Sequence, residues 1–167
     1  MGYFFYMKIK RITMTAMFAA LICILTYFIK IPTLNGYINI GDTLILLIGV
    51  LLPPVYSFFA SAIGSSLADI FSGYMIYAPI TFLIKGSISV ISYFIYNALK
   101  KKSNNFISLL ISFIIAELFM VTGYYIFDGF MYGFISSLAN ILFNLSQGIV
   151  SIIIALLLHK IIKNKIK

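Results

Sequence analysis

The segment YAPITFLIKGSISVISYFIYNALKKK, residues 77–102, decides the fold class of this chain. Its apolar run covers residues 77–99, carries one charge at Lys85 and ends at Lys100, Lys101 and Lys102. A helix over this run is roughly 34 Å long, which is enough to cross a hydrocarbon core of about 30 Å. We therefore interpret the segment as a transmembrane helix.

The composition extends this interpretation to the whole chain. Of the 167 residues, 62% are hydrophobic and 10% are charged. A water-soluble domain has far more charge for its apolar content, so that class of protein is excluded. At about 20 residues per spanning helix plus short connections, the chain holds about six such helices, which leaves no room within these residues for a soluble catalytic domain.

The breaks between apolar runs predict where these helices lie. We expect an all-α integral membrane protein with six transmembrane helices, at about 12–31, 38–52, 55–72, 77–99, 106–127 and 132–159, in a single domain covering 1–167. Pro53 and Pro54 lack an amide donor and separate the second helix from the third. The region 37–71 has too few apolar residues for two full spans, so we expect one of its helices to be short or tilted.

The basic residues predict the orientation. The net charge is +8, and ten of the twelve Lys and Arg residues lie in the head (8–11), the triple-lysine loop (100–102) and the tail (160–167). With six spans these three segments lie on one side, and the positive-inside rule makes that side, with both termini, cytoplasmic. We read the basic charge as a sign of membrane topology and expect no nucleic-acid partner.

Each of the last three predicted helices carries one polar stripe at helical spacing. The stripes are Tyr77, Thr81, Lys85 and Ser89; Glu117, Tyr124 and Asp128; and Asn140, Asn144, Gln147 and Ser151. If they face one another, they enclose an outward-opening pocket suited to a small, polar, aromatic solute. We expect polar contacts from Lys85, Glu117, Asn140, Asn144 and Gln147, with Thr81 beside them and with Tyr77 and Tyr124 as stacking surfaces.

Other interpretations of these polar residues remain open. The amides could form hydrogen bonds between helices and only hold the bundle together. Lys85 and Glu117 could form a structural ion pair, and Asp42 and Asp69 could cap helices. A proton-responsive Lys85–Glu117 pair would instead suit a self-sufficient proton- or ion-coupled carrier.

The sequence lacks the motifs of an enzyme. It has no phosphate-binding G-x-x-x-x-G-K-[ST] loop, no H-E-x-x-H, no C-x-x-C and no G-x-S-x-G. The single cysteine, Cys23, provides neither a disulfide nor a metal-ligand cluster. We expect no catalytic residue, no metal and no cofactor, and if ATP powers transport, the ATPases are other chains.

Several segments together resemble one family. They are the run 15–21 (TAMFAAL), 30–32 (KIP), 35–42 (NGYINIGD), 64–69 with 73–74, 77–86 (YAPITFLIKG), 116–117 (AE) and 139–148. In this order the chain is similar to the substrate-binding S components of energy-coupling factor (ECF) transporters, and closest to the riboflavin and hydroxymethylpyrimidine branch. Pro53-Pro54 departs from the Gly-Pro that is frequent in the family.

The resemblance implies a multi-pass protein of the bacterial cytoplasmic membrane that captures a vitamin or vitamin precursor from outside. It also implies a first extracellular loop over the pocket, which includes Asn35 and Gly36. Delivery would require a transmembrane T component and two cytoplasmic ATPase subunits. The family's Ala-x-x-x-Ala motif, which contacts the T component, matches Ala16 and Ala20. Riboflavin, a hydroxymethylpyrimidine and a pyridoxine-like ring all remain possible substrates.

Overall fold

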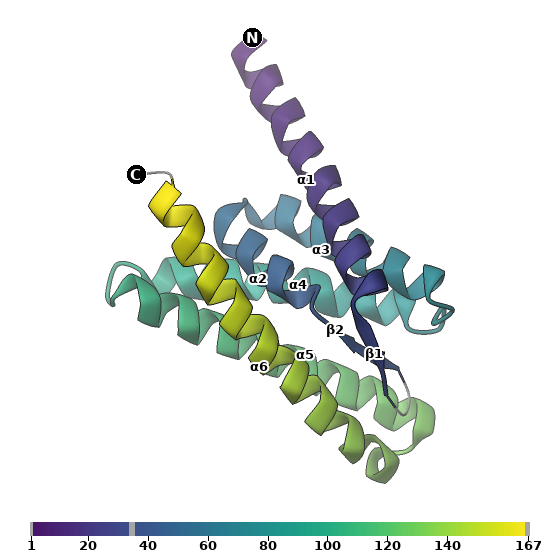
Figure 1. Cartoon of the computed structure of the whole chain (residues 1–167). Helices are drawn as coiled ribbons and strands as arrows, with labels where there is room; N and C mark the ends of the chain where they lie inside the picture. The colour runs from purple at the N-terminus through teal and green to yellow at the C-terminus, as the bar shows by residue number, and fades with distance from the viewer. Residues whose placement is uncertain (1, 34–35, 166–167) are drawn as a thin grey trace.

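The computed structural model describes residues 2–33 and 36–165, with side chains described for 8–33 and 36–162. Within these ranges the chain forms six helices and one short hairpin (Figure 1). The helices are α1 (Gly2–Phe28), α2 (Asp42–Leu51), α3 (Pro54–Phe71), α4 (Ala78–Leu99), α5 (Asn105–Tyr132) and α6 (Phe134–Lys165), and the strands are β1 (Lys30–Pro32) and β2 (Tyr37–Asn39). The helical architecture expected from the sequence is confirmed.

The hairpin is the main departure from the predicted elements. We expected helices over 12–31 and 38–52, but α1 ends at Phe28 and β1 pairs antiparallel with β2, Lys30 opposite Asn39. Pro32 cannot donate an amide to a continuing helix, and the Asn35-Gly36 pair in the sequence is a strong hairpin-turn signal. The first loop is therefore an ordered element, and α2 begins only at Asp42.

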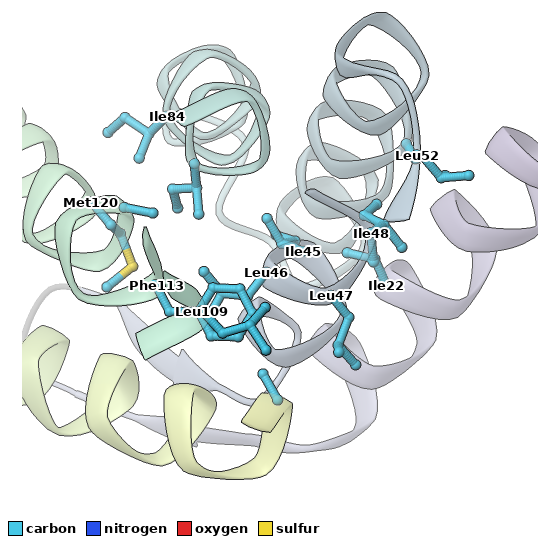
Figure 2. Close-up of a cluster of buried hydrophobic side chains, with 14 of the residues drawn as sticks. Ile22, Ile45, Leu46, Leu47, Ile48, Leu52, Ile84, Leu109, Phe113 and Met120 are labelled. Carbon is cyan, nitrogen blue, oxygen red and sulfur yellow. The ribbon is translucent and has the colours of Figure 1, made fainter. Parts of the chain in front are cut away.

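Helix α2 is the centre of the core. It has 10 residues, which corresponds to about 15 Å, or half of a bilayer's hydrocarbon thickness. Ile45, Leu46 and Ile48 are fully buried. Figure 2 shows them between Ile22 of α1 and Phe113 of α5. The short helix expected in the region 37–71 is therefore α2.

The outer surface of the bundle suits lipid. Four segments are long and apolar enough to cross a membrane, namely Lys8–Phe28, Ala78–Leu99, Asn105–Tyr132 and Phe134–Ile162. Large apolar side chains such as Phe94, Leu142 and Ile153 face outwards. In Figure 1 both chain ends lie in the upper part of the view, whereas the hairpin and the turn between α5 and α6 lie in the lower part.

Helices α1 and α3 approach closely at Gly64. A β-carbon at Gly64 would lie 2.5 Å from the carbonyl oxygen of Ala19 and 3.0 Å from Cβ of Ile22. Small residues at such crossings let helix backbones touch, which is the main source of helix association in lipid. The sequence Ala60, Gly64, Ala68 on α3 supplies this surface.

We expect Gly64→Val to lower the free energy of unfolding by about 1–3 kcal/mol, because the added atoms must push α1 away from α3. Titration with sodium dodecyl sulfate, followed by circular dichroism, measures this change. Gly36→Ala is the control, since a β-carbon there meets nothing within 4 Å. Equal stability of the two variants would contradict the close-packing role of Gly64.

Candidate binding cavity

A cavity lies beneath the hairpin, between α3, α4, α5 and α6. Its empty space, including the mouth, is about 590 Å³. Polar and aromatic side chains line most of the wall, which is unusual for the interior of a bundle in lipid.

Eight of the ten predicted site residues line this one cavity. They are Gly36, Tyr77, Thr81, Lys85, Tyr124, Asn140, Asn144 and Gln147. Asn35 lies outside the described residues. The remaining residue, Glu117, is placed elsewhere, as described below.

The floor of the cavity is a buried ion pair. Lys85 Nζ lies 2.7 Å from Oδ1 and 2.8 Å from Oδ2 of Asp42, and 3.2 Å from Sδ of Met120. The exposed fractions of Asp42 and Lys85 are 0% and 3%. The ammonium also lies 5.4 Å from the ring centroid of Tyr124. All three donors of Lys85 are therefore directed at Asp42 and Met120.

This pairing changes the interpretation of both charged residues. The Lys85–Glu117 ion pair that the sequence left open is not formed, because Asp42 is the partner of Lys85. Asp42 is also not a helix cap: Gly41 is the N-cap residue of α2 and no side chain caps it. Asp42 is the first residue of α2, shortly after the hairpin, and its side chain is fully buried in the bundle.

Gln147 connects the floor to the hairpin. Its Nε2 donates to Asp42 Oδ2, and its Oε1 accepts from the backbone N–H of Asn39 at 2.8 Å. Asn39 in turn accepts from the N–H of Gly41 at 2.9 Å. A β-carbon at Gly41 would lie 2.1 Å from Oγ1 of Thr26, so the close approach of this residue to α1 leaves no room for a side chain. The position of β2 over the cavity thus depends on α6 and α1.

The hairpin is also attached to α3. Tyr37 donates to Asp69 Oδ1, and Lys30 Nζ donates to Ser72 Oγ at 2.6 Å. Burial and then the nearby Asp69 carboxylate raise the pKa of the Tyr37 phenol far above its usual value. Tyr37 therefore remains a hydrogen-bond donor to Asp69, which is a wall residue and not a helix cap.

The opposite wall joins α4, α5 and α6. Asp128 accepts from Tyr77 Oη at 2.7 Å and from Asn140 Nδ2 at 2.9 Å. The hydroxyls of Thr81 and Tyr124 lie 3.0 Å apart and share a hydrogen bond. The polar stripes predicted on these three helices therefore do face one another around a cavity.

The structure corrects the placement of Glu117. It borders a separate, almost wholly apolar groove between α5 and α6. Both of its carboxylate oxygens are buried and have no hydrogen-bond partner among the described residues. Its spacing from Tyr124 puts the two on one helix face, but about 10 Å apart along the axis. Met120 lies between them and forms the floor, so the cavity ends before it reaches Glu117.

Several lining residues were not among the predicted site residues. They are Thr26, Thr33, Tyr37, Asn39, Ser65, Asp69, Tyr74, Asp128 and Phe143. Tyr37 and Asn39 could have been predicted from a strand pattern, because residues two apart in a strand lie on the same face. The prediction of a helix over about 38–52 did not include this strand.

The two alanines predicted to contact a partner are not part of the cavity lining. Ala16 and Ala20 are exposed on α1. Among the described residues, no group of three or more His, Cys, Asp and Glu side chains could hold a metal ion.

Comparisons with known proteins agree with this architecture. A solved structure described as "Structure and mechanism of the S component of a bacterial ECF transporter" matches with a TM-score of 0.77 and 28% identity, covering 96% of this chain and 99% of that chain. A protein of Pyrococcus woesei, described as "Uncharacterized protein in gap 3'region", is 34% identical over 138 residues, which is 83% of this chain and 90% of that protein.

The sequence model of the ECF-type riboflavin transporter S component family matches residues 6–164. This match covers almost the whole chain, including every helix that borders the cavity. The resemblance noted in the sequence is confirmed. The chain belongs to the ECF-type riboflavin transporter S component family, whose members are substrate-binding subunits of membrane transporters and not enzymes.

Proposed function

We propose that this protein captures a water-soluble vitamin or vitamin precursor, riboflavin or a hydroxymethylpyrimidine-like compound, from outside the cell. The observation that carries this proposal is the polar and aromatic cavity under the hairpin. A bundle surrounded by lipid gains little from burying so many polar groups unless a polar solute uses them. The lining combines hydroxyl, amide and aromatic side chains, which suits a polar ring compound of this kind.

The proposed contacts follow from the lining. Asn144 and Asn140 on α6 and Thr81 on α4 offer hydrogen bonds to the solute. Tyr77 and Tyr124 present ring faces for stacking. Lys85 and Gln147 form the polar floor, and Gly36 in the hairpin region, with Asn35 beside it in the sequence, belongs to the lid. Glu117 is not among these contacts.

The proposed orientation has six membrane spans, with both termini cytoplasmic and the hairpin outside. The triple lysine lies between α4 and α5, and the chain ends carry most of the other basic residues. The positive-inside rule supports a cytoplasmic location for these segments. In this orientation the cavity opens to the outside of the cytoplasmic membrane. We assign the protein to a bacterial membrane because the solved structure that it resembles is the S component of a bacterial transporter.

Transport in this proposal requires partner chains. The sequence has no nucleotide-binding motif, so ATP would be hydrolysed by two cytoplasmic ATPase subunits that act through a T component. Ala16 and Ala20 form a small-residue strip on the exposed side of α1, and such strips allow close docking of a second helix in lipid. We propose this strip as the contact with the T component.

We expect Asn144→Ala to weaken solute affinity by about tenfold, the scale of one hydrogen bond lost to a buried group. Isothermal titration of the purified protein with riboflavin or with hydroxymethylpyrimidine measures this. Asn97→Ala is the control, because Asn97 lies outside the cavity lining, near the C-terminal end of α4, and its Nδ2 donates to the backbone oxygen of Tyr93. Equal affinity of Asn144→Ala and the wild type would remove Asn144 from the site.

The rival mechanism, an ion-coupled carrier, is tested by vesicles containing this chain alone. We expect no uptake of the bound vitamin under a pH gradient. Uptake without any ATPase would contradict the proposed role.

A further inference from the structure

Two of the turns between helices carry large apolar side chains that the bundle leaves uncovered. They are the connection 72–77 between α3 and α4 and the turn at Gly133 between α5 and α6. The side chains at these two places, with exposed fractions of 46–88%, are Phe71, Met75, Ile76, Phe130, Phe134 and Ile135. Polar residues are usual in connections, so a group of exposed apolar side chains there indicates a surface that something other than water covers.

Both turns lie at the end of the bundle where the cavity is. Figure 1 shows them toward the right of the view, whereas the turn between α4 and α5, which carries the triple lysine, lies at the far left. Tyr74 in the α3–α4 connection lines the cavity, while its neighbours Met75 and Ile76 are exposed. Asp128 and Asn140, near the α5–α6 turn, also line it. The two turns therefore border the cavity.

The charge of the chain distinguishes the two ends of the bundle. No Asp, Glu, Lys or Arg lies between Asp69 and Lys85, and none lies between Asp128 and Lys160. The turn at the opposite end consists largely of the three lysines 100–102. Charged side chains are costly in lipid and apolar ones are not, so the uncharged turns suit lipid and the lysine turn suits water.

The length of α6 carries its apolar surface across the whole hydrocarbon core. From Phe134 to Lys160, the first lysine of α6, the axis rises by roughly 39 Å, whereas the core is about 30 Å thick. The excess of about 9 Å is close to the thickness of one headgroup layer, roughly 5–8 Å. With Lys160 at one boundary, Phe134 lies among the headgroups at the other, and any tilt of α6 draws it deeper into the membrane.

The α5–α6 turn holds its aromatic side chains in a defined cluster. Gly133 has a φ of +91°, a conformation that glycine adopts easily, and the chain reverses direction at this one residue. The ring centroid of Phe134 lies 5.6 Å from that of Phe130 and 5.8 Å from that of Tyr125. The rings pack on one another and still leave Phe130 78% exposed. The cluster therefore presents an apolar surface outwards.

We propose that these two turns insert into the boundary between headgroups and acyl chains in the leaflet on the cavity side, and that lipid is the partner that covers them. The exposed apolar surface of α5 and α6 continues from their turn through Ile126, Leu138 and Leu142, so it is continuous with the lipid-facing side of the bundle. Aromatic side chains at this boundary fix the depth of a membrane protein. The rim of the cavity then lies at the level of the headgroups, whichever solute binds and whichever side of the membrane it faces.

The test uses tryptophan fluorescence, because the chain has no tryptophan of its own. Phe130→Trp reports on the α5–α6 turn and Met75→Trp on the α3–α4 connection. Lys101→Trp is the matched control, since Lys101 is exposed in the lysine turn at the opposite end. Each full-length variant is placed in phosphatidylcholine nanodiscs, and its emission is quenched by iodide from the water or by a phosphatidylcholine brominated near the headgroup end of one acyl chain. All three variants carry the same indole, so its own preference for the interface is common to them.

We expect the brominated lipid to quench Phe130→Trp and Met75→Trp at least about threefold more strongly than Lys101→Trp, and iodide to quench them at least about threefold less, because lipid shields the two turns from water. An iodide quenching constant at either turn equal to that of the control would place that turn in water and overturn the inference.

The same measurement on the complex with the T component and the ATPase subunits separates lipid from protein as the covering partner. We expect quenching by the brominated lipid to persist at both turns in the complex. Quenching that assembly abolishes would show that a protein covers the turns, and would overturn the inference.

Discussion

Lys85→Met is expected to lower the free energy of unfolding by about 3–5 kcal/mol. The substitution leaves Asp42, which is fully buried, without its cation. Met120 and Gln147 cannot replace the lost charge, so a carboxylate remains in the interior with only an amide as donor. Titration with sodium dodecyl sulfate, followed by the helical circular dichroism signal, measures the change.

The double variant Asp42→Asn with Lys85→Met is the matched control. It removes both charges of the pair while keeping similar side-chain volumes, and replacing a whole buried pair is often close to neutral. We expect it to recover most of the stability lost in the single variant. A single variant as stable as the wild type, or a double variant no more stable than the single one, would show that the ion pair does not hold α2 against α4.

Ala20→Trp is expected to prevent assembly with the T component and the ATPases while leaving vitamin affinity unchanged. Ala20 is exposed on α1, so the indole adds bulk to the outer surface without entering the core. A docking surface built from small residues four apart depends on close backbone approach, which a tryptophan prevents. Co-purification of the four-chain complex measures assembly, and titration of the isolated subunit measures affinity.

Ala98→Trp is the control, since Ala98 is also exposed but lies near the end of α4. We expect this variant to assemble normally. If Ala20→Trp assembles as well as Ala98→Trp does, the strip of Ala16 and Ala20 does not dock the T component.

The sequence predicted the helical architecture because its signals are strong and local. Apolar runs interrupted by Pro, Gly or lysines mark the helices, and membrane helices must be long because their backbone polar groups need partners within the segment. The polar stripes predicted the cavity for the same reason. A side chain such as Asn144 or Thr81 recurs at helical spacing and faces the interior when lipid covers the other side.

The sequence could not predict how deep the cavity reaches. Glu117 shares a helix face with Tyr124, but the floor formed by Lys85, Asp42 and Met120 depends on where α2 enters the bundle. That entry point is set by the hairpin and by the tight turn at Gly41, which were hidden in a segment interpreted as the start of a helix. Pairing between helices distant in the sequence is a tertiary property that spacing within one helix does not encode.

The claim that the cavity captures a vitamin is tested most directly by identifying the compound that stays bound to the protein during purification. The wild-type subunit is purified in detergent from cells grown in rich medium and denatured, and the released compounds are identified by mass spectrometry and absorbance. We predict one flavin, pyrimidine or pyridine compound in about equimolar amount. A protein that releases nothing, and whose thermal transition no vitamin of these classes shifts, would contradict the claim that the cavity captures a vitamin.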